Sequence, residues 1–246
     1  MSNYAGYIMT FNLLSIINQD IGPSDQYVWI ATGYTLAVSA GALIWGRLSD
    51  VFGRRWFFIG GNALAFLGSI LGAAAQNIVT LIFAQVFIGL ALGSQLSFTI
   101  ALAELLPNKW RGYNNALLFF MSVPFSVFGP IVARDLIENT ARGWRWSYYI
   151  NLILSGMAIL LAAVFYHPPI FEQLHTRASK KKVLRELDYL GILLFVGGLV
   201  LFLIGLSWGG VIYPWSSART LSTLLVGLAL IVGFFMWGKL FQIRVP

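Results

Sequence analysis

The sequence predicts an all-α membrane protein, and three observations support that fold class. Hydrophobic residues occupy 58% of the 246 positions and charged residues only 10%, whereas soluble domains average about 45–50% and about 25%. The charged residues separate long uncharged runs, and a spanning helix needs about 20 mostly apolar residues. These runs lack the ten-residue alternation of membrane β-strands. The composition therefore excludes a soluble enzyme and a disordered tail, and the absence of cysteine excludes a disulfide-built secreted module.

About eight transmembrane spans are predicted from the uncharged runs. In chain order they cover 4–19, 27–47, 56–75, 79–103, 113–133, 147–166, 189–208 and 220–239. The uncharged run 56–103 is long enough for two helices, and its polar stretch 75–77 supplies the turn. The first span is the weakest because three asparagines dilute it, and we expect the chain to begin inside or just before that helix.

The distribution of Lys and Arg predicts the orientation of these spans. With alternating loops, twelve basic residues fall on one side of the membrane and four on the other. We expect the richer side to be cytoplasmic, which gives a multi-pass protein of the plasma membrane with both chain ends in the cytoplasm. Trp144, Trp146, Tyr148 and Tyr149 are expected to mark the opposite interface.

Small residues recur at every fourth position of two predicted spans. They are Gly61, Ala65, Ser69 and Ala73 in the third span and Gly89 and Gly93 in the fourth. Such faces let membrane helices approach closely, and in a bilayer packing drives their association. We expect these residues to lie at helix–helix contacts.

No set of residues supports catalysis, a metal or a cofactor, so the sequence predicts a protein that is not an enzyme. The two histidines, His167 and His175, lie in one loop, far from any serine–acid or metal-ligand pattern. The core of every predicted span lacks a charge, although charges inside a membrane usually mark proton or ion relays. The basic residues occur in short runs between apolar blocks, so nucleic acid is not an expected partner.

Uncharged polar side chains inside the spans are the candidates for lining a polar cavity. They are Asn12, Gln85, Gln95 and Thr99. Each can instead hydrogen-bond a neighbouring helix, and both alternatives stay open. Because Gln85 and Gln95 share the fourth predicted helix, that helix is the best candidate for the cavity wall.

The segment between the second and third spans carries the most specific pattern of the chain, Gly46-Arg47-Leu48-Ser49-Asp50-Val51-Phe52-Gly53-Arg54-Arg55. It resembles the G-x-L-[AS]-D-x-x-G-R-[KR] loop signature of the major facilitator superfamily, and every position of that signature is matched.

The signature has a physical interpretation as a conformational latch. Asp50 can face a helix N-terminus, where a carboxylate gains about 0.3–1 kcal/mol, and it can pair with Arg54. Gly46 lets another helix pass closely, and Gly53 permits a tight turn. Glu104 is a possible partner of this latch. The predicted latch residues are Gly46, Arg47, Asp50, Gly53, Arg54 and Arg55.

Further segments narrow the resemblance to a fungal branch of the fourteen-helix drug:proton antiporters. Gly129-Pro130 is similar to the core of the antiporter motif in the fifth helix, and Trp144–Asn151 resembles the W-R-W-x-x-x-x-N opening of the sixth. Gln85 departs from the pattern, because the fourth helix of these antiporters usually carries an arginine implicated in proton coupling. The segments that resemble transporters exporting trichothecene toxins or carrying siderophore-bound iron are 106–113, 165–169 and 206–210.

The resemblance implies a six-helix N-terminal transporter half at 1–166 with a truncated first helix, a basic cytoplasmic loop at 167–187, and two linker helices with a tail at 188–246. It also implies alternating-access transport of small organic molecules, as toxin and drug efflux or as siderophore-iron transport. Proton coupling is implied too, although the neutral Gln85 weakens it. The expected partners are a small-molecule substrate, the lipid bilayer and a missing C-terminal transporter half. The alternative is a non-transporting truncated membrane protein or an interaction subunit.

Overall fold

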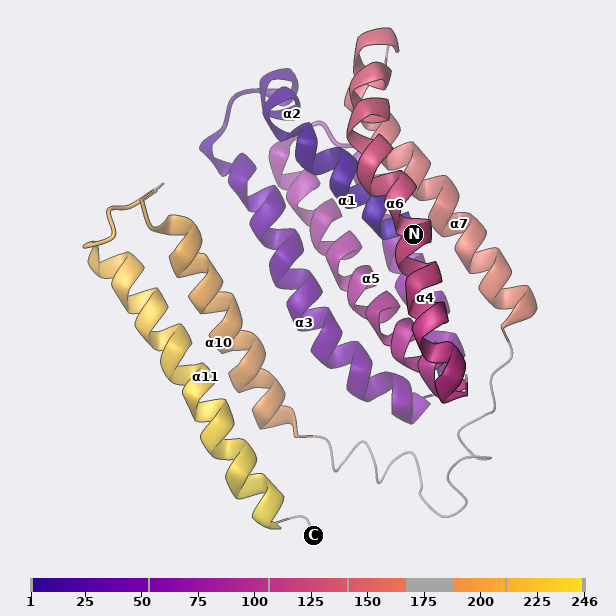
Figure 1. Cartoon of the computed structure of the whole chain (residues 1–246). Helices are drawn as coiled ribbons and strands as arrows, with labels where there is room; N and C mark the ends of the chain where they lie inside the picture. Colours follow the sequence, from indigo (N-terminus) through magenta and orange to yellow (C-terminus); the bar gives the residue numbers. More distant parts are fainter. Residues whose placement is uncertain are drawn as a thin grey trace. The chain divides into compact units, whose positions relative to one another are not determined.

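The computed structural model describes the backbone of residues 2–52, 54–105, 107–140, 142–166, 188–210 and 212–244 (Figure 1). Within these ranges the elements are helices, and the one bridge between extended residues, Gly209 with Tyr213, belongs to a turn. The all-α prediction is therefore confirmed. The chain forms two compact units, Met1–Thr176 and Arg177–Pro246. The predicted boundary loop 167–187 lies outside the described residues.

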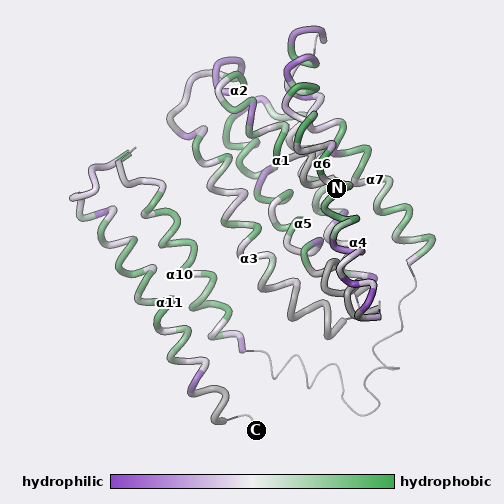
Figure 2. The backbone as a smooth tube through the Cα atoms, viewed as in Figure 1, coloured by the Kyte–Doolittle hydropathy of each residue, from purple (hydrophilic) through white to green (hydrophobic). Residues whose placement is uncertain are grey.

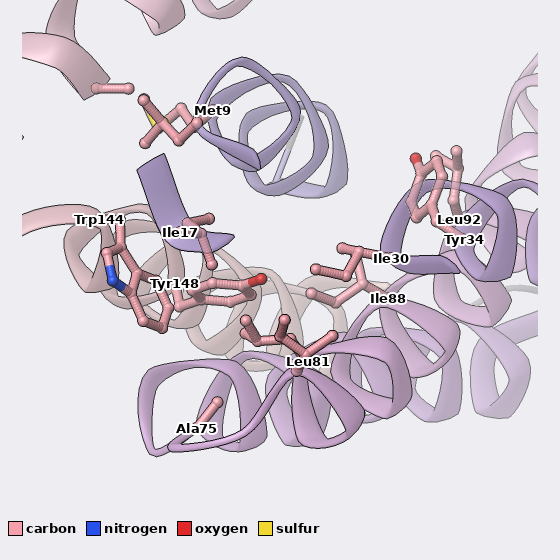
Figure 3. Close-up of a cluster of buried hydrophobic side chains, with 13 residues drawn as sticks. Met9, Ile17, Ile30, Tyr34, Ala75, Leu81, Ile88, Leu92, Trp144 and Tyr148 are labelled. Atoms are coloured by element: carbon pink, nitrogen blue, oxygen red, sulfur yellow. The ribbon is translucent and has the colours of Figure 1, made fainter. Parts of the chain in front are cut away.

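The first unit is a bundle of α-helices in which α5 is central. α5 packs against α3 and α4, whereas α7 packs against α4 and α1, and α6 lies against α1. Apolar side chains of several helices meet in one core, in which Tyr148 lies near Ile17 and Leu81 (Figure 3). The elements in chain order are α1 (Ser2–Asn12), α2 (Leu14–Ile21), η1 (Asp25–Tyr27), α3 (Val28–Phe52), α4 (Arg54–Ala73), α5 (Ile78–Leu105), α6 (Asn108–Asn139), η2 (Gly143–Arg145) and α7 (Trp146–Phe165).

The first predicted span, 4–19, is not one continuous helix, because a turn at Leu13 divides it into α1 and α2. The helix is interrupted at Leu13, whose amide donates to the carbonyl of Thr10, three residues earlier, at 3.1 Å. The break leaves helices of 11 and 8 residues, and each alone is too short to cross a bilayer. Gly22 then ends α2 with φ at 125°, a conformation that residues with a side chain rarely adopt.

The second unit is a hairpin of two helices, α10 (Tyr189–Trp208) and α11 (Ala218–Arg244). Asp188 caps the first of them, because its Oδ1 accepts a hydrogen bond from the Gly191 amide at 2.8 Å. The same oxygen accepts a second hydrogen bond from Trp237 Nε1 of α11 at 2.9 Å. One carboxylate thus caps α10 and joins the start of that helix to α11.

Six helices in the described residues are long and apolar enough to cross a membrane, namely α4, α5, α6, α7, α10 and α11. α3 has 25 residues, and its described apolar stretch is Val28–Ala42. Figure 2 shows hydrophobic residues along most of the length of α10 and α11. The prediction of about eight spans is thus confirmed for the last six, whereas a crossing by the first, which is interrupted at Leu13, stays a prediction.

The small-residue faces lie at helix contacts, as the sequence predicts. A Cβ added to Gly61 of α4 would lie 1.8 Å from Ser94 Oγ of α5. One added to Gly89 of α5 would lie 2.6 Å from the carbonyl oxygen of Tyr34 in α3. Both distances are shorter than any real contact of a Cβ atom, so these glycines allow a helix approach that alanine would prevent.

Candidate functional site

The loop signature lies where α3 passes into α4, since α3 ends at Phe52 and α4 begins at Arg54. The latch and its proposed partner stay predictions, and so does a cavity role for Thr99, because their side chains lie outside the described residues. The residues concerned are Gly46, Arg47, Asp50, Gly53, Arg54, Thr99 and Glu104.

Arg55 is the signature residue whose side chain the structure describes. Its Nη2 donates to the carbonyl oxygen of Ala163 at 2.7 Å, in the last turn of α7. The final carbonyls of a helix have no partner within the helix and carry partial negative charge. A residue of the signature thus binds the end of a helix that lies 108 positions further along the chain.

Gln85 of α5 is fully buried and hydrogen-bonds another helix. Its Nε2 donates to the hydroxyl oxygen of Tyr148 in α7 at 3.2 Å. The side chain of Thr10 in α1 makes a second hydrogen bond to the same hydroxyl group. Three helices therefore meet at one phenol group, and the structure gives Gln85 the partner in a neighbouring helix that was one of the two alternatives for it.

The other two candidates for a cavity wall are less buried. Gln95 is half-buried, and its Nε2 donates to Asn62 Oδ1 of α4 at 3.1 Å. Asn12 is exposed, and its Nδ2 donates to the carbonyl of Ile8 in its own helix at 2.7 Å. These are the hydrogen bonds that the two side chains make within the described part of the chain, and a cavity role for them stays a prediction.

A second polar contact joins α4 to α7. Asn151 Nδ2 donates to Ser69 Oγ at 2.8 Å, and Ser69 Oγ donates in turn to the carbonyl of Ala65. Sequence reasoning assigned no such role to Tyr148 or Asn151. A signal was present, since positions 144, 148, 151 and 155 follow the spacing of one helical face, and all four of these residues are buried.

Trp144 and Tyr148 correct the predicted aromatic belt. Their exposed fractions are 3% and 0%, so both belong to the core of the bundle. Trp144 Nε1 donates to Asp20 Oδ2 at 2.7 Å, which satisfies the one polar atom of the ring. Trp146 and Tyr149 are partly exposed and pack edge to face, and their place at the membrane interface stays a prediction.

The fifth-helix motif, Gly129-Pro130, lies in α6 where that helix meets α1. A Cβ on Gly129 would lie 3.7 Å from Ile8 and 3.8 Å from Met9, both in α1, which is ordinary van der Waals contact. Gly129 is buried, although most of α6 exposes large apolar side chains. The motif therefore marks the contact through which α6 joins the bundle.

The fully buried polar groups inside the bundle are neutral. The buried groups that link the helices are amides, hydroxyl groups and a phenol. Among the described residues, no group of three or more His, Cys, Asp or Glu side chains is placed to hold a metal ion. Such an arrangement fixes helices by hydrogen bonds that a bilayer core does not disrupt.

Comparison with known proteins gives a family match along almost the whole chain. The sequence model of the fungal trichothecene efflux pump family (TRI12) matches residues 3–246. A trichothecene efflux pump from Trichoderma arundinaceum is 36% identical over 240 residues, covering 96% of this chain and 39% of that protein. A trichothecene efflux pump from Fusarium sporotrichioides is 34% identical, and the match covers 90% of this chain and 37% of that protein. The MFS-type transporter pydD from an Acremonium species is 35% identical, covering 94% and 39%. The chain thus spans about two fifths of the length of these relatives.

Proposed function

Because this chain belongs to the fungal trichothecene efflux pump family, we propose that it forms the N-terminal part of a transporter that exports small organic molecules by alternating access. One observation carries the proposal, namely a family match that includes both compact units. The chain is a multi-pass membrane protein, which is the architecture that such a transporter needs. Its relatives are transporters, so we infer that the chain is not an enzyme.

The proposed substrate is a toxin-like secondary metabolite. Two relatives are named as trichothecene efflux pumps, which favours export of a toxin over transport of siderophore-bound iron. The proposed location is the plasma membrane, with both chain ends in the cytoplasm, because the Lys and Arg distribution favours that orientation.

In the proposed mechanism the loop signature is a conformational latch. Asp50 faces a helix N-terminus in one state of the cycle and loses that contact in the other, so it biases the equilibrium between the two states. Glu104 is the proposed partner of the latch. Asn12, Gln95 and Thr99 are proposed to line the cavity, and the neutral Gln85 leaves proton coupling to groups elsewhere.

A C-terminal half is the required partner in this mechanism. Superfamily members are built from two six-helix halves, with the substrate site near the bilayer midplane between them. Residues 1–166 are proposed to supply one half, and residues 188–246 to supply two linker helices that lead to the other.

The test is a transport assay in proteoliposomes. The chain is extended with the remaining part of the Trichoderma arundinaceum relative, and trichothecene and ferric siderophore are offered side by side. We expect saturable transport of the trichothecene and none of the siderophore. The parent relative is the positive control, and its C-terminal part alone is the negative control. Transport by the parent, but not by a chimera that inserts and folds, would contradict the proposal.

A further inference from the structure

Helices α4 and α7 form an antiparallel pair whose two ends are tied in the same way. Both helices are 20 residues long. Arg55 is the second residue of α4, and it reaches the last turn of α7. Arg145 directly precedes α7, and it reaches the carbonyl of Ala75, just beyond the end of α4. Each helix thus provides, at its start, the arginine that binds the end of the other.

At the end of α4, several neighbours fix the direction of the arginine. Arg145 Nη2 donates to the Ala75 carbonyl at 3.1 Å. The guanidinium carbon lies 4.3 Å from the centroid of the Trp144 ring, and Nη1 lies 3.7 Å from Asp20 Oδ2. The same Asp20 oxygen accepts the Trp144 hydrogen bond. A stacked and paired guanidinium has little freedom to turn away from the helix end.

At the end of α7, the arginine contact is shorter, and an aromatic contact lies next to it in the chain. Arg55 Nη2 donates to the Ala163 carbonyl at 2.7 Å. Phe58, one turn further along α4, meets the ring of Tyr166 edge to face with centroids 5.5 Å apart. Tyr166 directly follows α7, so this ring contact joins the same two helix ends as the Arg55 hydrogen bond.

Between the two ends the helices are in close contact in one register. Asn151 bonds Ser69 at 2.8 Å. A Cβ on Gly72 would lie 2.2 Å from the Tyr148 ring, which leaves room for glycine alone. Because polar and steric contacts fix the middle and arginines fix both ends, neither helix can slide along the other without breaking all of them.

We propose that Arg55 and Arg145 are reciprocal positioning residues, each holding the C-terminal end of the opposite helix so that α4 and α7 behave as one rigid unit. We call this arrangement the reciprocal arginine clasp. The clasp gives two residues of the loop signature different roles. Asp50 is proposed to act in one state of the transport cycle, whereas Arg55 holds the end of α7 in every state. The inference goes beyond the proposed function, because it holds whatever molecule the protein carries.

The test is amide hydrogen exchange on the 246-residue chain in lipid nanodiscs, because exchange measures opening segment by segment. The informative amides are those of Ala74 and Ala75 at the end of α4 and that of Tyr166 at the end of α7, which close the last turns. The variants are Arg145→Met, Arg55→Met and both together. Arg142→Met is the matched control, since the Arg142 guanidinium donates to the exposed Tyr149 hydroxyl at 2.9 Å. Among the described residues, its side chain makes no hydrogen bond to the end of α4.

We expect Arg145→Met to speed exchange at Ala74 and Ala75 about tenfold, the scale of a hydrogen bond to a charged group, with Tyr166 unchanged. Arg55→Met should speed exchange at Tyr166 to a similar extent and leave Ala74 and Ala75 unchanged. The double variant should speed exchange in the middle of both helices, near Ser69 and Asn151, by more than the product of the single effects. Arg142→Met should change none of these amides.

The lysine variants keep the proposal testable where a methionine variant does not fold. Lysine keeps a charged donor but not the planar fork, so Arg145→Lys and Arg55→Lys should restore most of the protection at the distant helix end. Three results would overturn the clasp. The first is an unchanged exchange rate at the distant helix end in a single methionine variant. The second is a double variant whose effect near Ser69 and Asn151 equals the product of the single effects, and the third is a lysine variant that loses protection in every helix alike.

Discussion

At the residue scale, the phenol group of Tyr148 organises the interior of the first unit. Its hydroxyl group bonds both Gln85 and Thr10 and so links α7 to α5 and α1. In the bilayer core, a polar group that loses its partner has no water to replace it. A neutral network therefore fixes these helices without a charge, which agrees with the uncharged span cores of the sequence.

Tyr148→Phe tests this network. The substitution removes the hydroxyl group and leaves the buried amide of Gln85 without its partner, so we expect the free energy of unfolding to fall by about 1–3 kcal/mol. The measurement is reversible unfolding in mixed micelles. Tyr149→Phe is the matched control, because Tyr149 bonds the exposed Arg142, and it should cost less than about 0.5 kcal/mol. Equal effects of the two variants would contradict a special role for Tyr148.

Asp50→Asn tests the proposed latch. The carboxylate is expected to act in one of two states, so its loss shifts a population and does not unfold the bundle. In a full-length context we expect a slower conformational cycle with nearly normal insertion and expression. The measurements are the transport rate and the distribution of states reported by distance labels. A wild-type rate together with an unchanged distribution would refute the latch.

Residue types could be predicted from the sequence more readily than their partners. Gln85 and Gln95 stand out because amides are unusual in an apolar helix, and the structure gives each a bond to another helix. The partner of Arg55 could not be predicted, because a contact across 108 positions depends on how two helices are placed. The burial of Trp144 could not be predicted either, because an aromatic residue near the end of a span is equally compatible with the membrane interface and with the protein core.

At the element scale, glycines set the distance between α10 and α11. A Cβ on Gly198 would lie 2.9 Å from the backbone nitrogen of Ile231, and one on Gly227 would lie 2.5 Å from that of Phe202. Gly205 continues this face, with a Cβ position 2.7 Å from Leu224. The contacts are with backbone as well as side chains, so they cannot be relieved by a change of rotamer.

Gly198→Ala and Gly197→Ala form a matched pair on adjacent positions of α10. We expect Gly198→Ala to push the two helices apart and to destabilise the hairpin by about 1–3 kcal/mol, as overpacking does. Gly197 has no atom within 4 Å of its Cβ position, so alanine there should be neutral or mildly stabilising. The measurement is resistance of the hairpin to unfolding in detergent. Equal stability of the two variants would mean that the glycine contacts between α10 and α11 do not control the packing of the hairpin.

The long helices could be predicted from the sequence because bilayer thickness sets both the length and the composition of a span. The break at Leu13 could not, since it arises from a local change of hydrogen bonding and no proline or glycine marks it. α6 also extends beyond both ends of the predicted span 113–133. It reaches from Asn108 to Asn139 and continues through Pro124 and Pro130, because hydropathy finds the apolar part of a helix and not its polar ends.

At the scale of the whole molecule, the charge distribution predicts the topology. Twelve Lys and Arg residues lie on one side against four on the other when the loops alternate, so the loop 177–185 should be cytoplasmic and 139–145 should not. Single cysteines can report this without interference, because the chain has none of its own. On intact cells, an impermeant thiol reagent should label 139–145 and spare 177–185. The opposite labelling would reverse the assignment.

We expect that this chain alone does not transport. Alternating access needs a site that opens first to one side and then to the other, and in this superfamily two halves form its walls. The chain spans about two fifths of the length of its relatives, and its proposed cavity residues Asn12 and Gln95 would face lipid without a second half. Two copies could pair about a two-fold axis, but the linker helices α10 and α11 would then connect nothing.

The measurement uses purified chain in proteoliposomes, with a crosslinker that reports the oligomeric state. Saturable, substrate-specific uptake or efflux above that of empty vesicles would instead make the chain a functional half-transporter.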